Sequence, residues 1–266
     1  MRDMSVRVEV MSCDAAEKAK RKTAAERVLQ EFGGDLPNLR LLAFLDDRDD
    51  PDVRREYGTA RGISGPIRRN SPTMSWLVDP LSGEVRRVLD DYGMYLHGST
   101  CDDETALIMT FAHELQHFVQ YGLKRQLWAV SGLIRRLPKE VQEKEQLNWP
   151  DIPHEREARI VAKRIGVRLC GEDAVNRYID RMIDEAQKGG IDQTIGEGAT
   201  KMEIEDLRFS RKLDSEVSYD LAFGIEQIYR RLRPYKRDFE SALEKMRNSV
   251  HRNDYEDVDL SPYFGG

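Results

Sequence analysis

The chain is poor in cysteine, has no long apolar run and carries no excess of positive charge. Its three cysteines are isolated and odd in number, so neither a disulfide framework nor a cysteine zinc knuckle is indicated. No apolar run approaches the roughly 20 residues that a membrane span requires, and the N-terminus lacks the apolar core of a signal peptide. These absences predict a cytoplasmic protein that does not contact a membrane.

The charge of the chain also limits its partners. A net charge of −6 at pH 7 argues against broad binding to a phosphate backbone, so no nucleic-acid partner is expected. Basic runs at residues 18–22 and 230–236 lie among acidic residues and are typical of solvated helix faces. The glycines form no phosphate-binding loop with a following Lys-Ser or Lys-Thr.

The first hundred residues alternate between strand and helix signals. Strands are expected at 6–11 and 38–45, with a helix at 15–32 between them that begins after Asp14 and ends at two glycines. Residues 46–71 are charged and broken by glycine and proline, which predicts a long loop. Two extended runs within residues 74–89 predict a β-hairpin, and residues 94–97 can add one more short strand.

From residue 102 onward the pattern is helical. Residues 190–213 are expected to be irregular, and the acidic tail at 253–266 to be loosely ordered. The expected class is α+β, with a small mixed or antiparallel sheet before a mostly helical half. The division favoured is 1–72, 73–190 and 191–266, or one domain throughout. Helices are expected at 103–122, 124–137, 154–170, 172–188, 215–232 and 235–250.

One motif carries recognisable chemistry. Residues 111–120 read FAHELQHFVQ, which places His113 and His117 four residues apart around Glu114. On a helix both imidazoles lie on one face and can reach one zinc ion, while Glu114 points to the neighbouring side, where it can take a proton from a metal-bound water. The motif therefore predicts two zinc ligands and a general base.

The surrounding pattern favours a helix at this motif. Leu107, Phe111, Leu115 and Phe118 form an apolar stripe at helical period, and the two histidines fall on the opposite side. That position disfavours two ordinary core histidines. Two surface histidines are the remaining alternative to zinc ligation.

The third zinc ligand must come from another helix, because the GxxH continuation of the metzincins is missing. A helix that begins PHEREARIVA follows at residue 153. An HExxH helix followed by such an EREA helix resembles the gluzincins, and more narrowly the small-scaffold ImmA/IrrE-type metallopeptidases. The resemblance covers about residues 74–170. The chain has Arg159 where that family has Asn or Asp.

The resemblance implies that the Glu before the Ala of this second motif, Glu157, completes the site. Glu157 and His154 both lie at the start of the apolar stripe of their helix, where a carboxylate is costly to bury unless it is paired or metal-bound. His154 is the main rival as third ligand. Glu155 falls with Arg159 on the other side and is expected to form a solvent-exposed pair.

The function expected is a zincin-like metallopeptidase that hydrolyses peptide bonds in a protein or peptide substrate, with Zn²⁺ as cofactor and a zinc-bound water activated by Glu114. Two alternatives are a regulatory or catalytically decayed zincin-fold protein dedicated to one partner, and a hydrolase of non-peptide amides. The oligomeric state is not indicated.

Two further expectations concern the substrate. A group that stabilises the oxyanion is required besides the metal, and no sequence context singles one out. By the resemblance, the strand around Tyr92–His97 could be an edge to which a substrate peptide adds. Cys101 is read as a buried or incidental thiol. The oxyanion candidates are Tyr121, Tyr219, His97 and His251.

Overall fold

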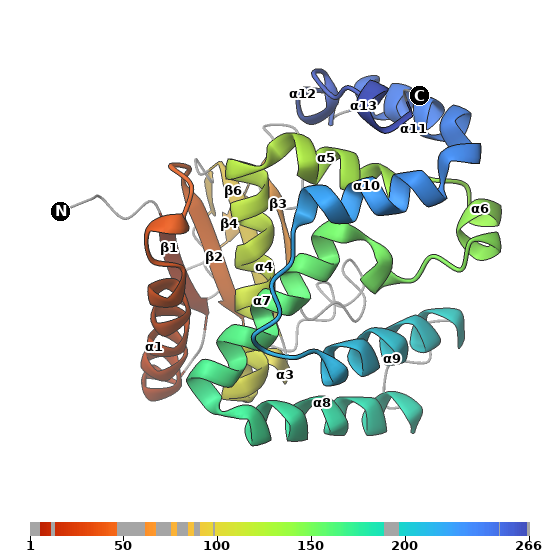
Figure 1. Cartoon of the computed structure of the whole chain (residues 1–266). Helices are drawn as coiled ribbons and strands as arrows, with labels where there is room; N and C mark the ends of the chain where they lie inside the picture. Colours follow the sequence, from red (N-terminus) through yellow and green to blue (C-terminus); the bar gives the residue numbers. More distant parts are fainter. Residues whose placement is uncertain are drawn as a thin grey trace.

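A computed structural model of the chain describes residues 6–11, 14–46, 62–67, 76–78, 85–87, 91–97, 99–188, 197–249 and 251–264. Within these residues a small sheet from the N-terminal part precedes a long helical part (Figure 1). The predicted α+β class is confirmed, and so is the mixed character of the sheet.

The main sheet has four strands in the order β1-β2-β6-β3. Strands β1 (Val6–Met11), β2 (Leu41–Asp46) and β6 (Tyr92–His97) run parallel, and β3 (Gly62–Pro66) lies antiparallel to β6. The strand Tyr92–His97 is therefore internal, and the expectation that it forms an edge is wrong. It is covered by β3, which occupies that end of the sheet.

Helix α1 (Ala15–Phe32) joins β1 to β2 as the sequence predicts. The carboxylate of Asp14 accepts hydrogen bonds from the backbone N–H groups of Ala16 and Glu17, which caps the first turn. The helix ends at Gly33, whose φ of +51° is the left-handed conformation that glycine adopts readily. A short 3₁₀ turn, η1 (Gly33–Asp35), follows.

The predicted hairpin is confirmed in its two strands, β4 (Trp76–Val78) and β5 (Val85–Arg87), which pair antiparallel as a separate sheet. The turn between them lies outside the described residues. The prediction of a loop over residues 46–71 is wrong at β3. Two glycines and a proline give this segment poor strand propensity, but pairing with β6 decides its conformation.

Two corrections apply to the helical part. Residues 197–212, expected to be irregular, form α9, whose Leu207 packs against Val175 and Tyr178 of α8. The tail is ordered rather than loose, because Tyr255 and Phe264 are buried in a C-terminal core. The helices are α3 (Ser99–Asp102), α4 (Glu104–Leu123), α5 (Arg125–Ile134), α6 (Lys139–Lys144), η2 (Trp149–Asp151), α7 (Pro153–Cys170), α8 (Glu172–Gln187), α9 (Glu197–Lys212), α10 (Leu221–Arg231), η3 (Arg233–Tyr235), α11 (Lys236–Arg247), α12 (Arg252–Tyr255) and α13 (Ser261–Phe264).

Helix α4 lies between the sheet and α7 (Figure 1). Its apolar stripe, from Leu107 to Phe118, is buried in one core with the sheet residues Leu41 and Met94, as predicted. Burial of each such side chain contributes about 1.5–3 kcal/mol. That core contains residues from before and after the boundary expected at residue 72. A second core joins α5, α10, α11 and the C-terminal segment.

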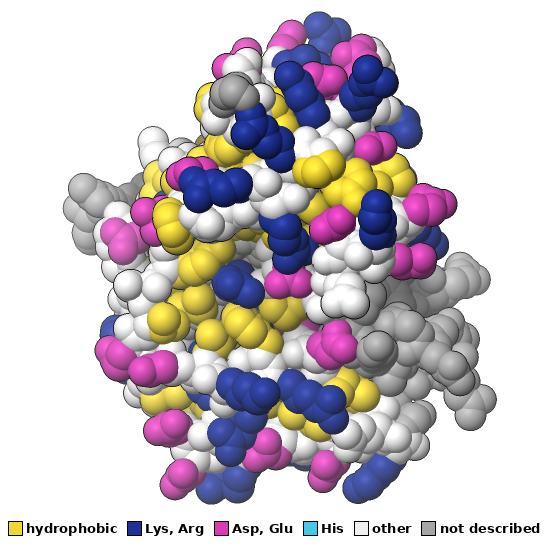
Figure 2. All heavy atoms as spheres, turned by 45° about the vertical axis from the view of Figure 1, so that its right-hand side comes forward, with side chains coloured by type: hydrophobic (Ala, Val, Ile, Leu, Met, Phe, Trp, Pro, Cys, Tyr) yellow, Lys and Arg dark blue, Asp and Glu magenta, His cyan; other side chains and the backbone are white. Residues whose placement is uncertain are grey.

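The surface turned forward in Figure 2 carries Lys and Arg side chains interspersed with Asp and Glu, with hydrophobic side chains between them. Neither sign of charge dominates this face. Among the described residues, no helix combines the length and apolar character that crossing a bilayer requires.

Candidate metal centre

His113 and His117 lie on the face of α4 that α7 covers. The helix begins after Asp103, whose carboxylate accepts a hydrogen bond of 3.0 Å from the N–H of Ala106. The apolar stripe fixes the rotation of α4 against the sheet, and this turns both histidines toward the first turn of α7. Both are buried, at 7% and 8% exposure.

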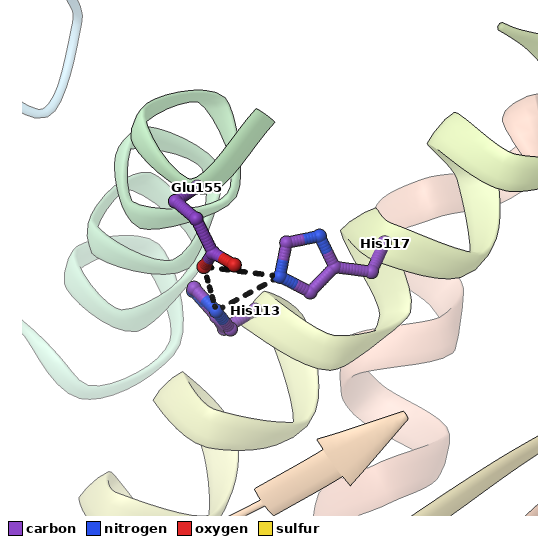
Figure 3. A group of neighbouring side chains, drawn as sticks. All are labelled: His113, His117 and Glu155. Atoms are coloured by element: carbon purple, nitrogen blue, oxygen red, sulfur yellow. Dashed lines mark hydrogen bonds and ion pairs between the residues drawn. The ribbon is translucent and has the colours of Figure 1, made fainter. Parts of the chain in front are cut away.

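Three potential ligand atoms converge between α4 and α7 (Figure 3). The Nε2 atoms of His113 and His117 are 3.1 Å apart, and Oε2 of Glu155 lies 3.4 Å from each. Tetrahedral zinc with ligands at 2.0–2.1 Å requires ligand atoms about 3.3–3.4 Å apart. The spacing therefore fits a metal ion with two nitrogen ligands and one oxygen ligand.

The orientation of the His117 ring is fixed by Gln120. The amide Nε2 of Gln120 donates to the backbone carbonyl of His154 and to Glu157, both at 2.8 Å. Its Oε1 must then face Nδ1 of His117, at 2.8 Å. An amide oxygen only accepts, so Nδ1 carries the proton and the lone pair of the neutral ring is on Nε2, toward the converging atoms.

The carboxylate of Glu155 is held in place through only one of its two oxygens. Its Oε1 accepts a hydrogen bond of 3.1 Å from Arg135 and lies 3.4 Å from Nε2 of His154. Its Oε2 has no hydrogen-bond partner within the described part of the chain. A buried carboxylate oxygen without a donor is costly, and a cation at the position facing both imidazoles would satisfy it.

The structure places Glu157 outside this group. Its carboxylate accepts from Gln116 at 3.1 Å, from Gln120 at 2.8 Å and from Lys124 at 2.9 Å. These donors account for both oxygens and explain how the carboxylate is buried. The carboxylate that lies beside the two imidazoles is that of Glu155, not that of Glu157 as the sequence suggested.

The rival ligand His154 is also outside the group. Its Nδ1 lies 2.7 Å from the hydroxyl of Ser131, which also accepts from the backbone N–H of His154 at 3.1 Å. Its Nε2 faces Oε1 of Glu155, the oxygen turned away from the histidine pair. His154 thus supports the Glu155 carboxylate. Burial lowers the pKa of His154, with the Glu155 carboxylate opposing the shift.

The expectation that Glu155 faces solvent beside Arg159 is wrong. Glu155 is 3% exposed, and Arg159 pairs instead with Asp206 of α9, with 2.5 Å between Nη2 and Oδ2. In the first turn of α7, His154, Glu155 and Glu157 are all buried, and only Arg156 is partly exposed. This explains why the helical period of the sequence did not distinguish Glu155 from Glu157.

Electrostatics separate the two imidazoles. Burial and the charge of Arg159 lower the pKa of His113 to about 3. Burial also lowers the pKa of His117, but the charge of the Glu155 carboxylate, whose Oε2 lies 3.4 Å from its Nε2, raises it above the usual value. Burial raises the pKa of Glu155, yet the charge of His117 and contacts with three imidazoles hold it well below its usual range. Glu155 is therefore anionic and His113 neutral near pH 7.

His113 differs from His117 in the surroundings of its second ring nitrogen. Its Nδ1 is buried and has no hydrogen-bond partner among the described residues. Metal-binding imidazoles normally donate this N–H to an acceptor. Arg159, which lies one turn beyond Glu155 on α7, is a donor only and offers this nitrogen no acceptor.

Glu114 lies under strand β3. A Cβ built on Gly62 would come within 3.0 Å of Cγ and 3.1 Å of Oε1 of Glu114, so only a glycine permits this approach. Burial raises the pKa of Glu114, against the opposing effects of the His117 charge and a hydrogen bond with Ser64. The carboxyl is therefore a better proton acceptor than an exposed glutamate.

The residues considered for oxyanion stabilisation have other contacts. Tyr121 donates to Asp254 at 3.2 Å and packs against Tyr92 and Trp128. Tyr219 packs against the C-terminal core, and burial raises its pKa to about 12. His251 precedes α12, and the side chain of His97 lies outside the described residues. Cys101 is buried, as expected, with its thiol 3.7 Å from the carbonyl of Leu96.

Sequence reasoning missed Arg135 and Gln120 as well as Glu155. Gln120 had a usable signal, because a side chain three residues after His117 shares its helix face. Arg135, just after α5, and Glu155 of α7 are twenty residues apart, and no local pattern connects them. Comparisons with protein-family models, curated proteins and solved structures found no match to this chain.

Proposed function

We propose that the chain is a zinc-dependent metallopeptidase with a zincin-like, gluzincin-type site, in which His113, His117 and Glu155 hold the metal. The observation that carries the proposal is the convergence of two Nε2 atoms and one unpartnered carboxylate oxygen at 3.1–3.4 Å. This convergence supports the HExxH interpretation, because both histidines of the motif then bind the metal and Glu114 lies next to one of them in the sequence.

The donor set favours zinc over other common ions. Imidazole nitrogen suits Zn²⁺, whereas Mg²⁺ and Ca²⁺ prefer oxygen ligands in larger number. Two histidines and one glutamate leave a fourth position for water or substrate, which is the arrangement of catalytic rather than structural zinc. The charges of the group agree, since the single carboxylate is anionic and one imidazole is already neutral near pH 7.

Zinc in this position supplies a Lewis acid that polarises a carbonyl and lowers the pKa of water. Glu114, one residue from His113, accepts the proton of the attacking water and later passes it to the leaving amine. Its raised pKa suits the first transfer, because a carboxylate of raised pKa accepts a proton more readily than an ordinary glutamate.

Strand β3 offers a place for an extended substrate. Among the described strands its only neighbour in the sheet is β6, and no described strand pairs with its other edge. Gly62 brings this strand against Glu114. A peptide that adds to β3 would run past the general base with its backbone held by main-chain hydrogen bonds. This role was expected for Tyr92–His97 and passes to Gly62–Pro66.

The test begins with metal content. Purified protein reconstituted with zinc should hold about one ion per chain, and His113→Ala should lose it. Wild-type protein and Glu114→Gln are then incubated with a whole-proteome peptide library, and new termini are identified by mass spectrometry. Glu114→Gln should keep its zinc and lose about 10²–10⁴-fold in cleavage rate.

A matched control is Glu104→Gln, which makes the same change on the same helix at a residue that pairs with Arg27. It should cleave like wild type. Wild-type protein that holds no zinc, or that holds zinc and cleaves no peptide in the library, contradicts the proposal. So does a Glu114→Gln variant that retains full activity.

A further inference from the structure

Arg159 follows Glu155 by one turn of α7, so both side chains leave the helix on the same face. Its guanidinium is paired with Asp206 of α9. The Asp206 carboxylate is 7% exposed and the Arg159 side chain 29% exposed. A buried carboxylate from a separate helix therefore fixes a guanidinium that is still partly exposed.

The hydrogen-bonding capacity of Arg159 is not filled. A guanidinium carries five N–H donors in a rigid fork. The Nε atom of Arg159 is buried and has no acceptor within the described part of the chain. An unmet buried donor costs about 1–3 kcal/mol, so this nitrogen is expected to meet an acceptor when the site is filled.

The charge of Arg159 acts on the proposed site. It is a main cause, after burial, of the lowered pKa of His113, and it also acts on Glu114. Arg135 is the other guanidinium near these residues, but it is bonded to Glu155 and stacked 3.9 Å over the Trp149 ring. Of the two, Arg159 is the one with a buried N–H that has no acceptor among the described residues.

We propose, on the basis of the peptidase function, that Arg159 donates a hydrogen bond to the carbonyl oxygen of the scissile peptide and that Asp206 positions it. As the oxygen of water bonds to the carbonyl carbon, the π electron pair of the C=O bond moves onto the carbonyl oxygen. The N–H of Arg159 faces the developing charge and transfers no proton. The C–N bond then breaks as Glu114 gives the proton taken from water to the amine, leaving a carboxylic acid and an amine.

This role follows from the chemistry of the group. The charge that forms on the carbonyl oxygen is best stabilised by a donor that is already oriented, because no reorganisation is then required during the reaction. Asp206 orients Arg159 before substrate binds. The two tyrosine candidates considered from the sequence show no comparable arrangement, since Tyr121 is bonded to Asp254 and Tyr219 packs in the C-terminal core.

The experiment compares two zinc-directed probes in zinc-loaded protein, by calorimetry rather than by activity. One is the N-phosphoryl derivative of a leucine–phenylalanine dipeptide amide, whose tetrahedral phosphorus carries oxygens that resemble the oxyanion. The other is the mercaptoacetyl derivative of the same dipeptide amide, which places one sulfur at the metal. Arg159→Met should weaken the phosphoryl probe by about 10²-fold and leave the thiol probe nearly unchanged.

Three further variants complete the test. Arg159→Lys should fall between wild type and Arg159→Met, because it keeps the charge but loses the fork. Asp206→Asn should weaken the phosphoryl probe less than Arg159→Met. The matched control is Arg211→Met, which removes another ion pair of α9, to Asp180 of α8, and should bind both probes like wild type. Zinc content and circular dichroism report folding for each variant.

The outcomes are separable. If Arg159→Met weakens both probes equally, or neither, Arg159 has a structural role only and the inference is overturned. If it fails to fold, Arg159→Lys and Asp206→Asn decide in the same way. If wild-type protein binds both probes and cleaves peptides while Arg159→Met matches Arg211→Met, only this inference falls. Wild-type protein that binds neither probe and cleaves no peptide removes the proposed function and this inference together.

Discussion

Oε2 of Glu157 accepts a hydrogen bond of 2.8 Å from Nε2 of Gln120, and that bond fixes which end of the amide faces His117. The residue that the sequence suggested as a metal ligand is thereby connected to the His117 ring through two hydrogen bonds, one on each side of Gln120. The adjacent turn position, Glu155, supplies the oxygen that faces both imidazoles. Supporting and ligating carboxylates differ in which donors surround them.

Substitutions of Glu155 and Glu157 should have different effects on zinc content. Glu155→Gln removes the anionic ligand and should reduce zinc to a small fraction of an ion per chain after dialysis. Glu157→Gln keeps the ligand atoms and should retain zinc, with an affinity about 10–100-fold weaker, as expected for loss of a supporting contact. Chelator competition measures both. Retention of tight zinc by Glu155→Gln, with loss in Glu157→Gln, would restore the sequence-based assignment.

Gln116 and Gln120 provide a matched pair. Both are buried and both donate to Oε2 of Glu157, but only Gln120 also bonds His117. Gln120→Met should lower zinc affinity about 10–100-fold, because the ring loses the acceptor for its Nδ1 proton. Gln116→Met should lower it several-fold at most. Equal losses in the two variants would show that the amide does not orient the ring.

The local part of the site was predictable, and the distant part was not. His113, Glu114 and His117 lie within one helix, so their relative placement follows from helical geometry alone. The third ligand depends on how α7 docks against α4 and α5. With His154, Glu155 and Glu157 all 5% exposed or less, no hydrophobic stripe reveals which side faces the histidines.

The fold shows the same division. Helix α1 and the apolar stripe of α4 were predicted because caps and periodicity are written in neighbouring residues. Strand β3 was missed because its two glycines and its proline have a weak local preference for a strand. Helix α9 was missed because glycines at positions 189, 190, 196 and 198 precede or open it. Partners far along the chain decide them, β6 for β3 and α8 for α9.

Zinc binding should release about one proton from the ligands at pH 6. His113, with a pKa of about 3, and Glu155, with a pKa well below 4.5, have already lost their protons. Because the Glu155 carboxylate raises the pKa of His117 above 6.5, that ring stays protonated at pH 6 and must lose its proton to bind. Affinity should therefore fall about tenfold for each pH unit below that pKa.

The measurement uses calorimetry in buffers of different ionisation enthalpy, in the Glu114→Gln background so that the Glu114 proton does not contribute. His251→Ala is the control, since His251 lies at the start of α12, and it should give the same proton count. Release of two protons would show that His113 is also charged in the metal-free protein, against the effects of its burial and of Arg159.

The approach of β3 to Glu114 gives the last prediction. A methyl group at position 62 would lie 2.8 Å from Cγ2 of Thr110 and 3.0 Å from Cγ of Glu114, so either the strand or the general base must move. Gly62→Ala should reduce peptide cleavage about 10–10²-fold, as expected for a displacement near 1 Å, with zinc content unchanged. Gly65→Ala on the same strand meets nothing within 4 Å and should be neutral. Adding Thr110→Ser to Gly62→Ala removes the closest contact and should restore part of the rate. Full activity in Gly62→Ala would mean that β3 does not set the position of Glu114.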